Sequence, residues 1–425
     1  MPSPLRDRDF RLLWAGQTAS QLAAHSSQLT LPLIAVVTVG ASAAEVGALR
    51  AVQQAPILLL SLFVGAWVDR RRTRRVLILS DLGRAAAMAA LPAAYALGVL
   101  RLPVLAAVAL LLGALTVCFD VTYQAALVRH VPRVQLTTAN SALEGSRSAA
   151  QIAGPGIGGG VMSLASAPVA ALLSAVSFGA SALFIRAMHR DGSPADERAA
   201  GMSPDAGGAG PPMRRRIAEG LRLVAREPVL RSVGIASALF QFSFAALMTV
   251  YVLYLPRELG LSGAAVGLIL AALGPGALVG SWLAAVLPGR RLRYGLVLVS
   301  SAVIADGAIL CVLTVTGSGT TATACLMAVN FLFGVASQLV DISVTAVRQA
   351  ITPIALQGRV VATINVVGMG LTPLGSLLGG ALAAQFGLRT GMTLTAVALA
   401  LSPLFMALSP LARLGRELPT PASQH

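Results

Sequence analysis

Acidic, basic and amide side chains recur at helical spacing inside long apolar stretches of this sequence. The acids Asp120, Glu144 and Asp341 stand out, because low-dielectric surroundings make a carboxyl costly to ionise whereas a neighbouring arginine favours the ionised form. A carboxyl subject to both influences is balanced between its two protonation states. It can take up a proton on one side of a membrane and release it on the other. We predict that these acids exchange protons, Asp120 and Glu144 before Asp341.

Other polar side chains accompany these acids at intervals of three or four positions, which places each set on one face of a helix. A polar face inside a membrane is expensive unless it is turned away from lipid. We therefore expect these faces to line a polar cavity. The predicted cavity residues are Gln21, His25, Gln28, Gln124, Arg147, Gln151, Gln241, Asn330 and Gln338.

Structural roles compete with these functional ones. Glu144 and Arg147 are spaced to neutralise each other, or to pair with Asp120 across helices. A single histidine such as His25 is more often a hydrogen-bonded packing residue than a proton carrier. Asp306 fits a hydrogen bond between packed helices. The residue pattern alone leaves these alternatives open.

The elements that must position these residues follow from composition. Of the 425 residues, 56% are hydrophobic and 12% are charged, with a mean hydropathy of +0.77, whereas an ordinary soluble protein has about 25% charged residues. We predict an integral, all-α membrane protein. Its net charge of +15 comes from arginines that lie mostly between the apolar stretches. That distribution follows the positive-inside rule, so no nucleic-acid partner is expected.

The sequence does not favour chemistry that needs a metal or a cofactor. Cys118, Cys311 and Cys325 lie in apolar stretches and form no C-x-x-C pair, and the histidines lack the spacing of metal ligands. No G-x-x-x-x-G-K-[ST] loop occurs, so ATP hydrolysis is not expected. We predict that the chain is not an enzyme and binds no cofactor.

A membrane-spanning helix needs about 20 mostly apolar residues. On this criterion we predict twelve spans, at 12–39, 45–68, 76–99, 103–128, 138–164, 168–189, 229–254, 263–287, 294–316, 321–348, 360–385 and 391–412. Arginines concentrate in alternate loops and in both tails, which places both termini in the cytoplasm. The predicted domains are a six-helix bundle at 1–189, a cytoplasmic linker with an amphipathic helix at 190–228, a second six-helix bundle at 229–413 and a cytoplasmic tail at 414–425.

The two predicted bundles repeat each other. Asp120 matches Asp341 at an offset of 221 in the numbering (341 − 120), and a Gly- and Pro-rich segment follows in each half, from position 154 and from position 372. The further matches, in the same order, are Gly65-x-Trp67 with Gly280-x-Trp282 and Pro132 with Pro353. This order indicates an internal duplication, the architecture with which many membrane transporters build a site near the midplane.

The loop after the second predicted span completes a resemblance to the major facilitator superfamily. Gly, three residues, Asp and a basic cluster form its signature there, and Arg72 stands where the family usually has Gly. The matching residues are Gly65, Asp69, Arg70, Arg74 and Arg75. The resemblance implies that Asp69 latches the two bundles on the cytoplasmic side when the transporter faces outward. A basic loop that only sets topology is the alternative.

A second motif lies in the fifth predicted span and resembles the G-P-x-x-G-G signature of antiporting exporters. Its residues are Gly154, Pro155, Gly158 and Gly159. Proline removes a helical hydrogen bond and bends the helix, and glycines permit close helix packing. Ordinary packing is the alternative role.

More closely, the chain resembles the twelve-span macrolide-efflux and enterobactin-efflux branch of the superfamily.

These observations predict a secondary active exporter of small amphiphilic molecules, such as antibiotics, toxic organic compounds or siderophores, working by proton antiport and alternating access. The expected partners are the substrate, protons and the lipid bilayer. We expect a monomer in the plasma membrane. Proton-coupled or facilitated uptake of a nutrient is the alternative, and a non-transporting membrane sensor is a remote one.

Overall fold

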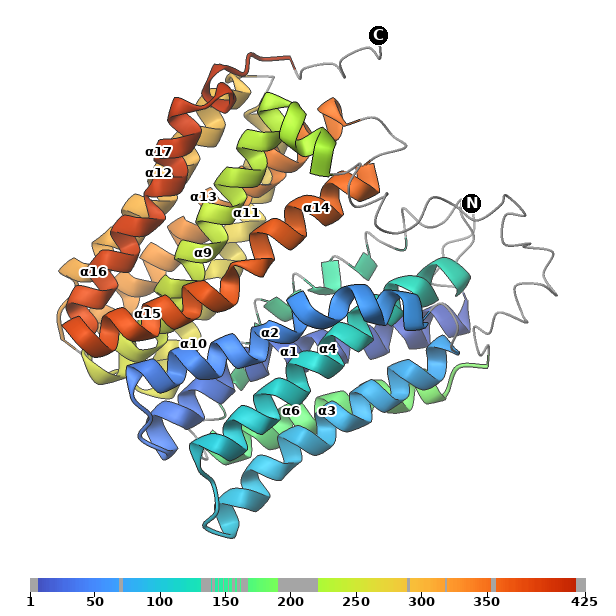
Figure 1. The fold of residues 1–425 in the computed structure, drawn as a ribbon. Helices are drawn as coiled ribbons and strands as arrows, with labels where there is room; N and C mark the ends of the chain where they lie inside the picture. Colours follow the sequence, from blue (N-terminus) through green and yellow to red (C-terminus); the bar gives the residue numbers. More distant parts are fainter. Residues whose placement is uncertain are drawn as a thin grey trace, which may run out of the picture. The chain divides into compact units, whose positions relative to one another are not determined.

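The computed structural model describes residues 7–68, 72–130, 139, 142–143, 145–147, 149–151, 153–154, 157–158, 161, 167–189, 221–288, 291–317, 319–352 and 357–417. Within these ranges the chain is helical and contains no β-strand (Figure 1). Nine segments of this described part are long and apolar enough to cross a membrane. The predicted all-α membrane fold is thus confirmed, while the count of twelve spans stays a prediction.

The chain divides into two compact units, which we describe separately. The N-terminal unit comprises residues 1–207 and 262–271, and the C-terminal unit comprises residues 208–261 and 272–425. The described helices of the N-terminal unit with printed bounds are α1 (Arg8–Leu33), which continues as the π-helical turn η2 (Ile34–Thr38), α2 (Ala43–Val68), α3 (Thr73–Ala96), α4 (Leu102–His130), α6 (Ala167–Arg186) and α10 (Gly263–Ala271).

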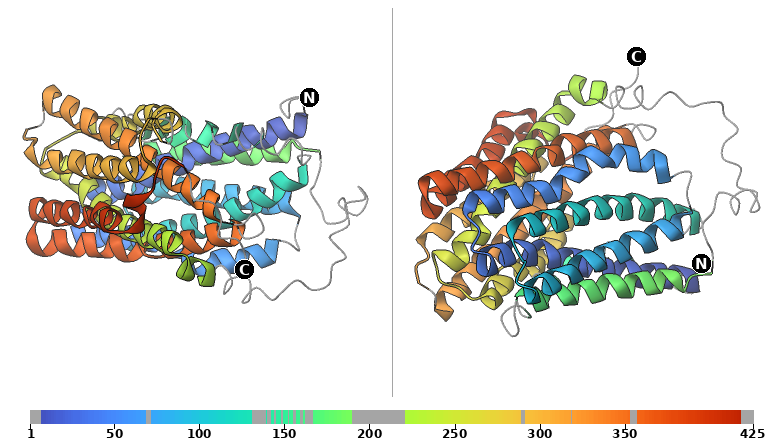
Figure 2. Two further views of the ribbon diagram at one scale, coloured as in Figure 1. Left: turned by 90° about the horizontal axis from the view of Figure 1, so that it is seen from above. Right: turned by 60° about the horizontal axis from the view of Figure 1, so that its bottom comes forward.

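Helix α1 begins where the Asp7 carboxylate accepts hydrogen bonds from the backbone amides of Asp9 and Phe10, at 2.8 and 3.3 Å. Such a cap satisfies amides that the first helical turn leaves unpaired. Phe10 then enters a buried core with Leu77 of α3 and Phe119 of α4. Helix α3 packs against both α4 and α6, and the ribbons of these helices can be followed in Figure 2.

The described helices of the C-terminal unit include the two longest ones, α9 and α13, together with several short ones. These are α9 (Pro228–Arg257), α11 (Leu273–Val286), α12 (Tyr294–Cys311) with the turn η4 (Val312–Thr314), α13 (Thr320–Ile351), α14 (Gln357–Gly370), α15 (Thr372–Phe386), α16 (Leu388–Leu399), α17 (Leu401–Leu408) and the turn η6 (Pro410–Arg413).

Three predicted spans, 263–287, 360–385 and 391–412, are interrupted, although the hydropathy pattern predicts one continuous helix for each. The breaks fall just before Pro275, Pro373 and Pro403. Proline has no backbone N–H to donate and its ring collides with the preceding turn, so a helix breaks or kinks next to it. The sequence pattern locates these spans correctly but does not indicate their breaks.

The predicted duplication has a counterpart in how glycines pack inside each unit. A Cβ atom at Gly113 of α4 would lie 2.1 Å from the carbonyl oxygen of Gln53 in α2. A Cβ at Gly334 of α13 would lie 2.3 Å from the carbonyl oxygen of Leu273 in α11. The two glycines are separated by the same offset (334 − 113) as Asp120 and Asp341. Only a residue without a side chain allows such helices to approach so closely.

The same offset extends to other helix pairs. Gly158 contacts Ser26 of α1, and Gly379, at the equivalent position (379 − 158), contacts Ala246 of α9. Helices α3 and α12 begin at equivalent positions too, at Thr73 and Tyr294 (294 − 73). Between α1 and α9 the offset is shorter by one, as Ser26 and Ala246 show (246 − 26). A nearly constant offset therefore relates equivalent positions of the two units.

Candidate functional site

A cavity of about 400 Å³ lies within the C-terminal unit, bounded by α9, α12, α13, α14 and α17. Phe240, Phe244 and Phe333 form an aromatic wall on one part of it. The rings of Phe240 and Phe244 have centroids 5.3 Å apart, and those of Phe244 and Phe333 are 5.7 Å apart, both pairs stacked. Stacked rings give a rigid apolar surface, which suits the apolar part of a ligand.

Polar groups line the rest of the cavity. Three residues predicted from the sequence meet here, namely Gln241 of α9 and Gln338 and Asp341 of α13. Asp341 is exposed and interacts electrostatically with Arg348, which lies further along the same helix and also lines the cavity. Gln241 and Gln338 are half-buried. Amides, one charged pair and an aromatic wall in the same cavity are groups that can orient an amphiphilic molecule.

Asp306 of α12 also lines this cavity and is its buried acid, with an exposed fraction of 5%. Its oxygen Oδ2 is buried and has no hydrogen-bond partner within the described part of the chain. The sequence pattern favours a packing hydrogen bond for this side chain. The structure instead places it at the wall of a cavity.

Asn330 is predicted to line a cavity but lies outside the lining of this one. Its side chain is buried, and its Nδ2 donates to the hydroxyl of Tyr251 at 2.7 Å and to the carbonyl of Leu326 at 2.9 Å. The bond to Tyr251 joins α13 to α9. In this structure Asn330 therefore links two helices.

The polar residues predicted on α4 lie at the surface of the N-terminal unit. Asp120 and Gln124 are exposed, one helical turn apart. Asp120 lies within electrostatic range of Arg84 and Arg147. An exposed aspartate in a spanning helix would be costly against lipid, so this face of α4 must border water or polar groups. Glu144, the partner predicted for Arg147, lies outside the described residues.

The remaining predicted polar residues of this unit lie on α1 and on the helical stretch around position 150. Gln28, Arg147 and Gln151 are exposed, and Gln21 and His25 are half-buried. His25 is within electrostatic range of Arg147. These positions are consistent with a polar surface shared by α1 and the segment of the fifth predicted span.

A buried cluster that the sequence analysis did not identify occupies the interior of the N-terminal unit. Arg84 and Asp81, one turn apart on α3, form an ion pair with exposed fractions of 1% and 0%. Arg84 also donates to the hydroxyl of Ser20 in α1 at 2.9 Å. Its guanidinium lies over the rings of Phe119 and Phe178, 4.3 and 4.5 Å from their centroids. This cluster could have been predicted from the sequence, because an acid and an arginine three positions apart in an apolar helix lie on the same face and can pair.

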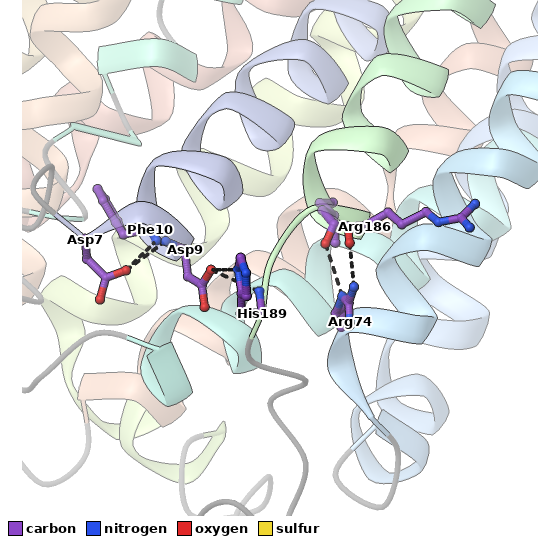
Figure 3. Close-up of polar contacts among 7 residues, drawn as sticks. Asp7, Asp9, Phe10, Arg74, Arg186 and His189 are labelled. Atoms are coloured by element: carbon purple, nitrogen blue, oxygen red, sulfur yellow. Dashed lines mark hydrogen bonds and ion pairs between the residues drawn. The ribbon is translucent and has the colours of Figure 1, made fainter.

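The loop motif contributes a contact at the end of α6. Arg74 donates from Nε to the carbonyl oxygen of Ile185 at 3.3 Å and from a terminal nitrogen to that of Arg186 (Figure 3). Unpaired carbonyls at a helix C-terminus favour such a cation. Gly65 belongs to α2 and Arg75 is exposed, while Asp69 and Arg70 lie outside the described residues. The described part of the motif thus ties α3 to α6.

A second tie at this end joins α1 to the residues after α6. The backbone N–H of His189 donates to Oδ1 of Asp9 at 3.0 Å, and the His189 ring lies 3.8 Å from the same oxygen (Figure 3). Asp9 is buried. Both ties hold the N-terminal unit together next to the loop motif.

In the fifth predicted span, Gly154 and Gly158 are described and buried, and both face α1. A Cβ at Gly154 would lie 2.7 Å from the Cβ of His25, and the Ser26 hydroxyl donates to the Gly154 carbonyl at 3.0 Å. Pro155 and Gly159 lie outside the described residues. The described glycines of this motif therefore form a close helix contact.

Comparison with known proteins agrees with this architecture. The sequence profile of a family described as transmembrane secretion effector matches residues 2–423. The multidrug efflux pump Tap of Mycolicibacterium fortuitum is 30% identical over 350 residues, which cover 79% of each protein.

Among solved structures, a bacterial homologue of the human lysosomal transporter Spinster, in an inward-facing and occupied conformation, superposes with a TM-score of 0.74 at 14% identity, covering 97% of this chain and 98% of that one. The nucleoside transporter NupG gives a TM-score of 0.72 at 14% identity, covering 94% and 99%. At such identities these likenesses establish the fold alone.

Proposed function

This chain belongs to the transmembrane secretion effector family of the major facilitator superfamily, and we propose that it is a secondary active exporter of small amphiphilic molecules driven by proton antiport. It is a multi-pass membrane transporter, and its family and fold are those of transporters rather than enzymes. The observation that carries the finer proposal is the cavity in which an aromatic wall accompanies Gln241, Gln338 and Asp341.

The cavity supports a substrate class rather than one substrate. Its aromatic wall would hold an apolar ring or chain, and its amides and the Asp341–Arg348 pair would hold polar groups of the same molecule. Antibiotics, toxic organic compounds and siderophores combine such features. Export is supported by the similarity to a multidrug efflux pump.

Proton coupling would use the acids predicted from the sequence. Asp120 is exposed on α4 within electrostatic range of two arginines, and Asp341 is exposed in the cavity within electrostatic range of Arg348. Each is accessible to water and influenced by a nearby cation, as a proton-exchanging group must be. Glu144 remains the third proposed group.

The proposed transport cycle is alternating access, with substrate carried outward as the two bundles rock. Both termini and the 190–228 linker would lie in the cytoplasm of a monomer in the plasma membrane. Asp69 would act as the cytoplasmic latch, with Arg74 holding the start of α3 against α6. The proposed domain boundaries are those predicted from the sequence.

Drug susceptibility in an efflux-deficient bacterial host tests the proposal. Expression of the chain should raise the inhibitory concentration of several amphiphilic compounds severalfold, and a protonophore should remove the effect. The variant Gln338→Ala should lower this resistance, because it removes an amide from the cavity wall. Glu258→Gln changes an exposed acid at the end of α9 and should leave the resistance unchanged.

Vesicle orientation then separates export from uptake. Inside-out vesicles energised to an acidic interior should accumulate a compound identified in the susceptibility panel, and right-side-out vesicles should not. Accumulation only in right-side-out vesicles would identify an importer. An unchanged susceptibility panel with no accumulation in either orientation would contradict transport of amphiphiles.

A further inference from the structure

Several residues of the buried arginine cluster in the N-terminal unit correspond, by the numbering offset, to residues that line the cavity of the C-terminal unit. Most of the two units are related by one numbering offset. At that offset Asp81 corresponds to Ala302 (302 − 81), and Arg84 corresponds to Ala305 (305 − 84). Phe119 corresponds to Val340 (340 − 119). At the offset that relates α1 to α9, Ser20 corresponds to Phe240 (240 − 20). All four counterparts line the cavity.

The side chains at these positions explain why one unit is filled and the other is hollow. In the N-terminal unit the long Arg84 side chain and the Phe119 ring fill the space and are both buried. In the C-terminal unit alanine replaces the arginine and valine replaces the phenylalanine. Removing large buried side chains without collapse of their surroundings leaves a cavity.

The cavity of the C-terminal unit has an acid in its wall but no arginine at the position equivalent to Arg84. Asp306, directly after Ala305, is buried at the cavity wall, and its Oδ2 has no hydrogen-bond partner among the described residues. Arg348 also lines the cavity, but it is with Asp341 that this arginine interacts. A buried carboxylate normally requires a paired cation and hydrogen-bond donors.

The buried cluster of the N-terminal unit shows which kind of group these positions can bind. The Arg84 guanidinium is bound by a carboxylate, a hydroxyl and two aromatic faces. The cavity of the C-terminal unit is lined by the Asp306 carboxylate, the Ser402 side chain and the aromatic wall of Phe240, Phe244 and Phe333. Aromatic faces attract cations as well as apolar groups.

We infer that the C-terminal cavity binds an organic cation, a guanidinium or ammonium group carried on an apolar body, with Asp306 as its counter-charge. The ligand would take the place that Arg84 takes in the other unit. The inference deepens the proposed function and rests on it in one respect, namely that the bound cation is cargo.

A matched pair of small probes tests the site on purified full-length protein in detergent. Benzylguanidine is a cation, and benzylurea has nearly the same shape without the charge. Equilibrium dialysis should show the wild-type protein binding benzylguanidine about tenfold more tightly than benzylurea or better, as a charge-assisted contact predicts. Asp306→Asn should reduce this preference to less than about twofold while benzylurea binding persists, and Glu258→Gln should preserve it. No preference in the wild type, or an undiminished one in Asp306→Asn, would overturn the assignment.

A second variant keeps the test decisive if Asp306→Asn folds poorly. Ala305→Arg places the N-terminal unit's arginine in the cavity and should abolish the preference for benzylguanidine. Ala305→Met adds comparable bulk without charge, so it should weaken both probes and retain the preference. If the Ala305→Arg variant still prefers benzylguanidine over benzylurea as strongly as the wild-type protein does, the assignment is wrong.

The export assays separate this inference from the proposed function. If Asp306-dependent benzylguanidine binding is found while expression confers no resistance, the cation site stands and the exporter proposal fails. If resistance is found and binding does not depend on Asp306, the exporter proposal stands and the site fails.

Discussion

Gly154 lies directly against Ser26. The Ser26 hydroxyl donates to the Gly154 carbonyl oxygen at 3.0 Å, and a Cβ at Gly154 would lie 3.1 Å from the Ser26 backbone nitrogen. The equivalent glycine of the other unit, Gly375 (375 − 154), also packs closely against a neighbouring helix, since a Cβ there would lie 2.2 Å from the carbonyl oxygen of Phe242 in α9. The motif that resembles an antiporter signature is therefore also a packing device, present once in each unit.

Substitution of Gly154 tests this packing role. Gly154→Val should destabilise the protein by about 1–3 kcal/mol, because α1 must shift to admit the side chain. Gly145→Val in the same predicted span is the matched control, since a Cβ there meets nothing within 4 Å. Thermal unfolding in detergent measures the difference. Equal melting temperatures for the two variants would refute close packing at Gly154.

The buried ion pair of the N-terminal unit should be essential as a pair. Arg84→Ala should cost about 3–5 kcal/mol, because it leaves the Asp81 carboxylate buried without its cation and opens a cavity. The double variant Asp81→Asn with Arg84→Met removes both charges and should recover much of that loss. Unfolding curves of the single and double variants test this. A double variant less stable than Arg84→Ala would show that the charges act independently.

Asp120 should matter for coupling rather than for folding, because its side chain is exposed. Asp120→Asn should abolish protonophore-sensitive resistance and leave the melting temperature within about 2 °C of wild type, as expected for a surface substitution within about 0.5 kcal/mol. Glu258→Gln removes an exposed acid elsewhere and should preserve resistance. Proton-driven efflux that survives in Asp120→Asn would exclude Asp120 from coupling.

The Asn330–Tyr251 hydrogen bond should contribute to stability and not to substrate recognition. Tyr251→Phe should lower stability by about 1 kcal/mol, the net worth of one buried hydrogen bond. Tyr95→Phe is the control, because Tyr95 is exposed. Melting temperature and the substrate profile are measured together. A changed order of substrates in Tyr251→Phe, without destabilisation, would place Asn330 in substrate recognition instead.

Helical spans were predictable because hydropathy is a local property of the chain. The predicted span 103–128 is observed as Leu102–His130, and 321–348 as Thr320–Ile351. The internal repeat was also recognisable, since equivalent helices keep a nearly constant offset. Broken spans were missed because hydropathy averages over a window and is insensitive to single prolines such as Pro373 and Pro403.

The composition of the cavity was predicted only in part. Gln241, Gln338 and Asp341 were expected from helical spacing, which reports the face a residue shares with its neighbours. Asn330 shares that face on α13, yet it bonds to Tyr251 and lies outside this cavity. Periodicity does not say which other helix a face meets, and that partner decides whether a polar group is bonded or left lining a space.

By itself, the sequence determined that the chain enters the membrane and where most of its described helices lie, and its residue spacing indicated an internal repeat. Hydropathy and spacing can be read from the chain without knowledge of its packing. Only the tertiary structure decided that Arg84 is enclosed by Asp81 and two aromatic rings, while Ala305 and Asp306 border a cavity. The physical reason is that filling depends on the summed volume and charge of side chains from several helices. Residues far apart in the chain supply those side chains, so the sequence of any one segment does not show whether the space between the helices is filled.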